Sequence, residues 1–144
     1  MTRYYEDLKA GQSATLMRTV TERDIQLFGE ATGDFNPVHF DEAYAKKTVF
    51  RGRVAHGVLS IGFMSAVMGT ELPGPGTIFV SATTLFKGPV RIGDTVVTTC
   101  TVKEVRARRE VVMECRCEVN GKVVVEGEAL VLAPKKPVSA SENA

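Results

Sequence analysis

The stretch from Gly57 to Thr70 constrains the fold more than any other part of this chain, because it is long, uncharged and apolar on nearly every side of a helix. Large apolar residues are spread around most of its helical wheel, and small residues such as Gly62, Ser65 and Ala66 stand between them. A helix that is apolar nearly all round must be buried nearly all round. The rest of the chain must therefore supply a layer that wraps around this helix.

Runs of residues with a high preference for strands can supply such a layer. One run covers residues 13–20, and four more follow the apolar helix at 77–86, 95–105, 110–120 and 122–132. In the third of these four, apolar residues alternate with Glu114, Arg116 and Glu118, which predicts a strand with one buried face and one wet face. Asn120-Gly121 is a strong signal for a tight hairpin. The pattern predicts an α+β fold, with an antiparallel sheet around one long helix.

The length of 144 residues fits a single domain with one core. We expect this domain to cover residues 1–133, and residues 134–144 to form a flexible tail. The net charge of +1 gives no electrostatic reason to expect nucleic acid or an anionic membrane as a partner. The most apolar window, residues 57–68, is too short to span a bilayer.

The three cysteines, Cys100, Cys115 and Cys117, contain no CxxC motif and form no zinc-site pattern. We expect reduced, buried thiols, and the N-terminal residues lack the apolar core of a signal peptide. Both features favour a cytoplasmic location or a matrix-like compartment. A sheet curled around a helix leaves edge strands, so we also expect subunits to pair into a homodimer or a higher homo-oligomer.

Candidate chemistry gathers in the loop Gly33–Phe40, where a carboxylate, an amide and an imidazole fall within six residues. A helix that begins after Thr21 and is closed by Gly33 delivers the chain to this loop. Residues 41–47 are predicted to form a second short helix after it. The chain has only two histidines, and the second, His56, directly precedes the apolar helix.

The chain resembles a known family in two segments, Asp34-Phe35-Asn36-Pro37-Val38-His39 and Val54-Ala55-His56-Gly57-Val58. Together they are similar to the signature of the hot-dog-fold (R)-specific enoyl-CoA hydratases, the MaoC-like group. The resemblance extends from about Tyr5 to Leu132 in the order of elements. It implies a hot-dog fold and a hydro-lyase that reversibly hydrates trans-2-enoyl-CoA to (R)-3-hydroxyacyl-CoA. It also implies no metal and no cofactor, with coenzyme A or an acyl carrier protein entering as part of the substrate.

By this resemblance Asp34 and His39 are the catalytic pair that activates one water. Asn36 would help to fix the loop or the water, and Ser65 would lie near the acyl group. Each residue could instead have a purely structural role. Asp34 can simply make an Asx-turn, Asn36-Pro37 can be an ordinary turn, and a lone histidine is more often structural than catalytic.

Hydration of a double bond conjugated to a thioester passes negative charge transiently onto the thioester oxygen, which needs a hydrogen-bond donor already aimed at it. The main-chain amide of Gly57, at the start of the buried helix, is such a donor, and glycine lets the thioester come close. His56, just before it, either orients this oxyanion loop or packs in the core.

Other functions compete with hydration. Related hot-dog enzymes, such as thioesterases and 3-hydroxyacyl-carrier-protein dehydratases, commonly carry a catalytic carboxylate on the central helix, and residues 57–70 contain none. A non-catalytic acyl-CoA-binding module has no need of an Asp/His pair beside an oxyanion donor. The pattern favours the hydratase and leaves the acyl carrier and the acyl length open. The turn Arg106–Arg109 either is a solvated turn or binds the phosphates of coenzyme A.

Overall fold

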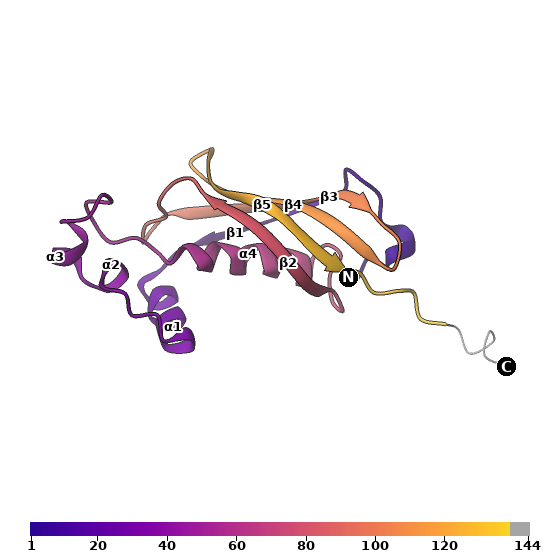
Figure 1. The fold of residues 1–144 in the computed structure, drawn as a ribbon, viewed down its shortest axis with the longest axis horizontal. Helices are drawn as coiled ribbons and strands as arrows, with labels where there is room; N and C mark the ends of the chain where they lie inside the picture. The colour runs from indigo at the N-terminus through magenta and orange to yellow at the C-terminus, as the bar shows by residue number, and fades with distance from the viewer. Residues whose placement is uncertain (139–144) are drawn as a thin grey trace.

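The structure, a computed structural model, describes residues 1–138. Its helices are the 3₁₀ helix Tyr5–Asp7 and the α-helices α1 (Glu22–Thr32), α2 (Pro37–Phe40), α3 (Glu42–Ala45) and α4 (Gly57–Thr70). Its strands are β1 (Ser13–Thr19), β2 (Ile78–Phe86), β3 (Thr95–Val105), β4 (Glu110–Val119) and β5 (Lys122–Leu132). The strands and α4 form the body of the molecule, and α1, α2 and α3 lie together beyond the N-terminal end of α4 (Figure 1).

The strands form one antiparallel sheet of five strands in the order β1-β3-β4-β5-β2. Each strand predicted from the sequence is present. The predicted hairpin between β4 and β5 turns at Asn120 and Gly121, which have positive φ angles of 51° and 77°. Two positive φ angles are what the favoured two-residue hairpin turn requires. β1 and β2 are the two edges of the sheet. The connection from β2 to β3 bonds to the segment before α4, where Ala55 N donates to Val90 O (2.7 Å).

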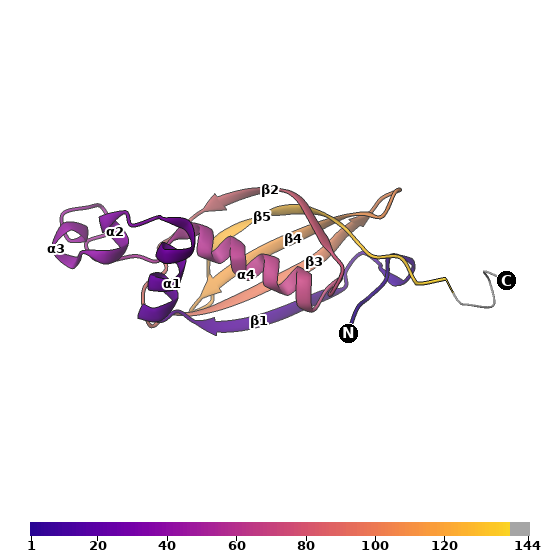
Figure 2. The same ribbon diagram turned by 90° about the horizontal axis from the view of Figure 1, so that it is seen from below.

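The core lies between the sheet and α4, which runs along one face of the sheet (Figure 2). The predicted alternation in β4 is confirmed, because its apolar residues are buried whereas Glu114 and Arg116 are exposed. Met64, Val67 and Met68 of α4 are buried against this face. Burial of each such side chain contributes about 1.5–3 kcal/mol to stability. An antiparallel sheet wrapped over one long helix confirms the expected α+β fold of the hot-dog kind.

One prediction about α4 is wrong for the single chain, because the helix is not buried nearly all round. The sheet covers one side of it, and no other element within residues 1–138 covers the opposite side (Figure 2). Val58 is 55% exposed, and Gly62, Ser65 and Ala66 are exposed as well. The apolar pattern indicates faces that favour burial, and α4 has one such face that this chain leaves open. Among residues 1–138, no helix is long and apolar enough to cross a membrane.

Helix α1 begins and ends where the sequence predicts. Thr21 Oγ1 accepts a hydrogen bond from Asp24 N (3.2 Å), and Asp24 Oδ2 accepts one from Thr21 N (2.9 Å), which is a capping box. Gly33 ends the helix with a φ of 79°, in the left-handed region that glycine favours. The second short helix, predicted over residues 41–47, is present as α3 but is shorter. Capping therefore fixes the point at which the chain enters the loop of candidate residues.

The two ends of the described chain meet at the end of the molecule opposite α1 (Figure 1). Tyr5 N donates to Pro134 O (2.8 Å), and Lys136 Nζ lies 3.0 Å from a carboxylate oxygen of Asp7. The first residues of the predicted tail are thus bonded to the N-terminal 3₁₀ helix. The remainder of that predicted tail, residues 139–144, lies outside the described residues.

We expect Gly127→Ala to destabilise the sheet strongly. A Cβ atom at this position of β5 would stand 2.0 Å from the main-chain oxygen of Thr83 in β2, so the two strands would have to separate. The expected loss is about 3 kcal/mol in the free energy of unfolding, measured by urea denaturation at a fixed protein concentration.

The matched control is Gly69→Ala in α4, where no atom lies within 4 Å of the added Cβ. Its stability should stay within about 1 kcal/mol of the parent protein. Equal unfolding midpoints for the two variants would contradict the close approach of β2 to β5.

Candidate active site

Side chains of the loop after α1 bond to the loop's own backbone. Asp34 Oδ1 accepts a hydrogen bond from Asn36 N (3.3 Å), which is the Asx-turn expected if Asp34 has only a structural role. Asn36 Oδ1 accepts one from Val38 N (3.2 Å) and caps α2, with Pro37 at the first helical position. The segment Gly33–Phe40, expected to be a loop throughout, therefore contains a short helix. The Asp34 side chain nevertheless stays exposed, so the turn leaves its carboxylate free for chemistry.

Two buried imidazoles tie this loop to the chain before α4, and they do so reciprocally. His39 Nδ1 donates to the main-chain oxygen of Val54 (2.7 Å), and His56 Nε2 donates to the main-chain oxygen of Asp34 (2.9 Å). The two rings pack with centroids 3.9 Å apart. Because a carbonyl oxygen can only accept, each of these nitrogens must carry a proton. The Nε2 atom of His39 is then the ring nitrogen available to take a proton.

The carboxylate of Asp34 lies close enough to the imidazoles to share one water with them. Ligand-type atoms of Asp34, His39 and His56 all fall within 4.8 Å of one another. A water that makes two hydrogen bonds of about 2.8 Å can bridge groups at this separation. The same three groups could offer donors to a metal ion, but each imidazole already uses one nitrogen on a carbonyl. The expectation that no metal binds here stays a prediction.

The environment of His39 favours its neutral form. Burial lowers the pKa of this imidazole below its ordinary value, and the hydrogen bond to Val54 opposes that effect only in part. Neighbouring His56 lowers the pKa of His39 further, whereas Asp34 raises it. A neutral imidazole whose Nδ1 is occupied presents the Nε2 lone pair, which is the form a general base requires.

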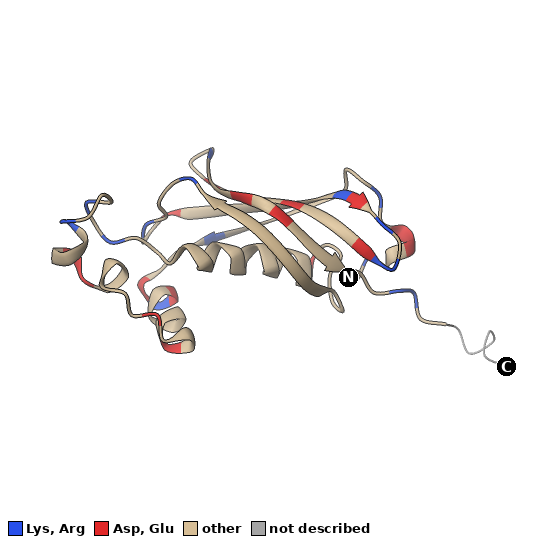
Figure 3. Ribbon diagram, in the orientation of Figure 1, with Lys and Arg blue, Asp and Glu red and all other residues tan. Residues whose placement is uncertain are grey.

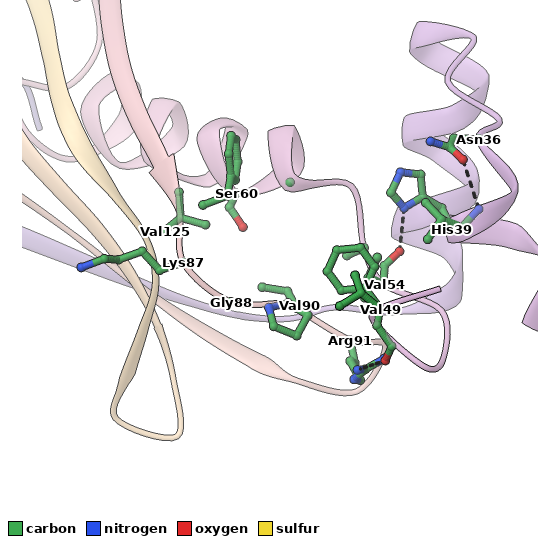
Figure 4. A pocket seen from close by; sticks show the side chains of 16 residues that line it. Asn36, His39, Val49, Val54, Ser60, Lys87, Gly88, Val90, Arg91 and Val125 are labelled. Carbon is green, nitrogen blue, oxygen red and sulfur yellow. Dashed lines mark hydrogen bonds between the residues drawn. The ribbon is translucent and has the colours of Figure 1, made fainter. Parts of the chain in front are cut away.

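A cavity of about 550 Å³ opens beside His39. Figure 4 shows His39 and Ser60 on opposite sides of it. Its walls are mainly apolar and include Val38, Val49, Phe50, Val54, Val90 and Val125. An apolar cavity with a few polar groups on its walls is typical of a site for a small organic ligand.

Gly57 lies on the wall of this cavity as the first residue of α4. Its main-chain N–H belongs to the first turn, where helical amides have no partner within the helix, and the helix dipole favours negative charge there. A Cβ atom at this position would stand 2.8 Å from the ring of Phe86, at the end of β2. Glycine therefore allows the aromatic ring to cover the start of the helix. The predicted oxyanion donor lies on the same cavity as His39.

Arg53 fixes the position of His39 by bonding to its main-chain oxygen. Its Nε donates to the main-chain oxygen of His39 (2.7 Å), and its two terminal nitrogens donate to the carboxylate of Glu22 at 3.0 and 2.7 Å. The bond from Arg53 lowers the pKa of Glu22, so this pair stays charged well below neutral pH. Arg91 donates in turn to the main-chain oxygen of Arg53 (3.1 Å). This network joins α1, α2 and the segment before β3.

The structure separates two groups of predicted residues. Five of the six predicted site residues, Asp34, Asn36, His39, His56 and Gly57, meet at the junction of the loop and α4. Ser65 does not line the cavity and is exposed in the single chain, so its place near an acyl group stays a prediction from the resemblance.

Sequence reasoning missed several residues that the structure brings to the site. Ser60, Phe86 and Arg91 line the cavity, and Arg53 holds His39. Ser60 and Ser65 stand on the same uncharged helix, and their spacing alone did not show which one faces the cavity. The turn considered for phosphate binding joins β3 to β4 at the end of the sheet far from the start of α4 (Figure 1), and the main-chain oxygen of Arg106 in this turn accepts a bond from Tyr5 Oη (2.6 Å).

The two histidines provide a direct test of this geometry by NMR, because the chain has no others. Neutral His39 should be the Nδ1–H tautomer and neutral His56 the Nε2–H tautomer, as their carbonyl partners require. The His39 ring should titrate below its ordinary pKa of about 6.5, because it is buried. Long-range ¹⁵N–¹H spectra across a pH series report both properties. The same tautomer in both rings, or a His39 midpoint above the ordinary value, would contradict the reciprocal pair.

The site can be compared with those of known proteins. The family model described as "MaoC like domain" matches residues 6–123. The chain is 54% identical over 134 residues to an (R)-specific enoyl-CoA hydratase from Rhodospirillum rubrum. The aligned region covers 92% of this chain and 93% of the relative. It is 46% identical to a 3-hydroxybutyryl-CoA dehydratase from Methylorubrum extorquens, covering 92% of this chain and 85% of the relative.

Solved structures agree with these relatives. An R-hydratase from Pseudomonas aeruginosa in the unliganded form superposes with a TM-score of 0.88 at 41% identity, covering 96% of each chain. An (R)-hydratase from A. caviae superposes with a TM-score of 0.85 at 33% identity, covering 90% of this chain and 99% of that one. From the matched family model, the relatives and the shared fold, we conclude that the chain belongs to the MaoC-like domain family.

Proposed function

We propose that this protein is a hydro-lyase that reversibly hydrates trans-2-enoyl-CoA to (R)-3-hydroxyacyl-CoA. One observation carries the proposal: ligand-type atoms of Asp34 and His39 lie within 4.8 Å of each other, which one water can bridge, and His39 and Gly57 line the same apolar cavity. Relatives named as an (R)-specific enoyl-CoA hydratase and a 3-hydroxybutyryl-CoA dehydratase support the same reaction in its two directions.

The reaction requires two proton transfers, and the Asp34/His39 pair can serve both. As the water oxygen bonds to C3, the pair accepts a proton from that water, and the electrons of the double bond move onto the thioester as an enolate. The enolate then collapses as C2 takes a proton back from the pair. The pair ends in its starting state, so the same groups run the reverse dehydration. Each positioned acid or base contributes a factor of about 10²–10⁴ in rate.

The enolate oxygen requires a donor that is in place before charge develops. The Gly57 N–H, supported by the dipole of a 14-residue helix, is that donor in our proposal. Asn36 and His56 hold the loop that carries Asp34, through the α2 cap and the bond to the Asp34 carbonyl. These groups supply each role that hydration needs, so we propose no bound cofactor, with coenzyme A carried as part of the substrate.

The activity is tested with crotonyl-CoA, by following the loss of the conjugated enoyl-thioester absorbance. Asp34→Asn and His39→Ala should each lower kcat by a factor of about 10²–10⁴, because each removes one member of the proton-transfer pair. The product should be the (R) isomer, as determined with stereospecific dehydrogenases. Glu30→Gln, an exposed change on α1, is the matched control and should retain the parent rate. An (S) product, or unchanged rates in both variants, would refute the assignment.

We further propose that two copies of the chain pair through β2 and the open side of α4. β2 is an edge strand without a charged residue from Ile78 to Phe86, and α4 is uncharged along its whole length (Figure 3). Large apolar side chains on β2 are about half exposed or more, namely Ile78 at 52%, Val80 at 51%, Leu85 at 63% and Phe86 at 53%. Natural edge strands are normally protected by charges or proline, and this one has neither. A second copy of the same edge would cover it.

Light scattering coupled to size exclusion should therefore report a mass of about twice 15.6 kDa or a higher multiple. Ala66→Arg places a charge on the open side of α4, where the single chain can solvate it but a paired subunit cannot. This variant should shift the protein toward the monomer. Met17→Arg, at an exposed position of the other edge strand, is the control and should leave the mass unchanged. A monomeric parent protein would contradict the proposed pairing.

We also propose a cytoplasmic location. Cys100, Cys115 and Cys117 are buried free thiols, and burial raises the pKa of Cys117. Unpaired thiols of this kind suit a reducing compartment. Cell fractionation that recovers the protein from an oxidising compartment would contradict this location.

A further inference from the structure

Ser60 is a buried polar residue for which the proposed reaction, as described so far, has no use. It is 2% exposed, and its hydroxyl points into the cavity from the side opposite His39 (Figure 4). Its main-chain oxygen accepts a bond from Cys117 Sγ (3.7 Å), and its hydroxyl has only that cysteine's sulfur, a weak hydrogen-bond partner, beside it among residues 1–138. A thiol is a poor partner for a hydroxyl, so this hydroxyl can bond more strongly to a polar atom of a ligand in the cavity.

The helix directs this hydroxyl toward Gly57. Side chains of an α-helix lean toward its N-terminus and cover the turn before their own Cα. For Ser60 that turn begins at Gly57, three residues earlier, where the ring of Phe86 lies against the main chain. A helical serine often bonds to the carbonyl four residues back. Here that carbonyl, of His56, accepts from Leu59 N (3.1 Å), and Ser60 makes no such bond.

We propose that the Ser60 hydroxyl is a second hydrogen-bond donor to the thioester oxygen, alongside the Gly57 amide. This inference rests on the proposed hydration and assigns a further catalytic residue to it. The oxyanion of the enolate has lone pairs for two donors, and the apolar cavity walls strengthen both bonds. The proton of Ser60 stays on its oxygen while the enolate forms and collapses. His39 lies on the opposite side of the cavity (Figure 4), so it is not placed to deprotonate Ser60 and make it a nucleophile.

The kinetic test compares Ser60→Ala and Ser60→Cys with the parent enzyme, using crotonyl-CoA. Loss of one oxyanion donor should lower kcat by a factor of about 10²–10³ in Ser60→Ala and change KM much less. Ser60→Cys, with its weak S–H donor, should fall between alanine and serine. The pH profile of kcat/KM should keep its shape, because Asp34 and His39 are untouched. Ser13→Ala, an exposed serine at the start of β1, is the control and should match the parent.

The spectroscopic test separates a donor from a packing residue. Butyryl-CoA labelled with ¹³C at the thioester carbonyl cannot be hydrated, and two donors should lower the stretching frequency of its carbonyl when it binds. The frequency should lie closer to that of the free ligand in Ser60→Ala than in the parent enzyme. Thermal unfolding of each variant reports whether the fold is retained.

The outcomes distinguish this inference from the proposed function. A parent enzyme without hydratase activity would refute the proposed function itself. An active parent with equal kcat and an equal carbonyl band in Ser60→Ala would overturn the role of Ser60 alone. A slower Ser60→Ala with an unshifted carbonyl band would also overturn it, because the loss would then come from packing.

Discussion

The reciprocal pair of hydrogen bonds from His39 to Val54 and from His56 to Asp34 is the interaction on which the site depends. Each imidazole is carried by one segment and bonds to the backbone of the other, so neither segment can move without breaking a bond. The two imidazole rings also pack against each other, with centroids 3.9 Å apart. Since α4 begins directly after His56, the same contacts set the distance between the proposed proton-transfer pair and the helix start at which we propose the thioester oxygen binds.

This arrangement divides the chemistry between two parts of one cavity. The loop side holds a carboxylate and an imidazole that burial keeps neutral, which suits proton exchange with a single water. The α4 side offers fixed donors, which suit an oxygen that becomes negative only during the reaction. Apolar walls between them exclude competing solvent and strengthen both interactions. The helix carries no carboxylate, which is why our proposal assigns proton transfer to the loop.

The sequence predicts well what local chemistry determines. The cap at Thr21, the close of α1 at Gly33 and the Asn120-Gly121 hairpin depend on residues a few positions apart, and all three are confirmed. Features that depend on distant partners were missed or wrong. The exposed side of α4 depends on which elements cover it, and Arg53 matters only because folding places Glu22 and the His39 carbonyl within its reach.

The central claim is that one loop delivers both the hydroxyl group and the proton, so both must add to the same face of the double bond. Hydration of crotonyl-CoA in D₂O tests this directly, since the product gains one deuteron at C2 and its diastereomers differ in their vicinal proton coupling. The account predicts a single diastereomer, from addition of the oxygen at C3 and the deuteron at C2 on the same face. The diastereomer of opposite-face addition, or a mixture, would contradict it.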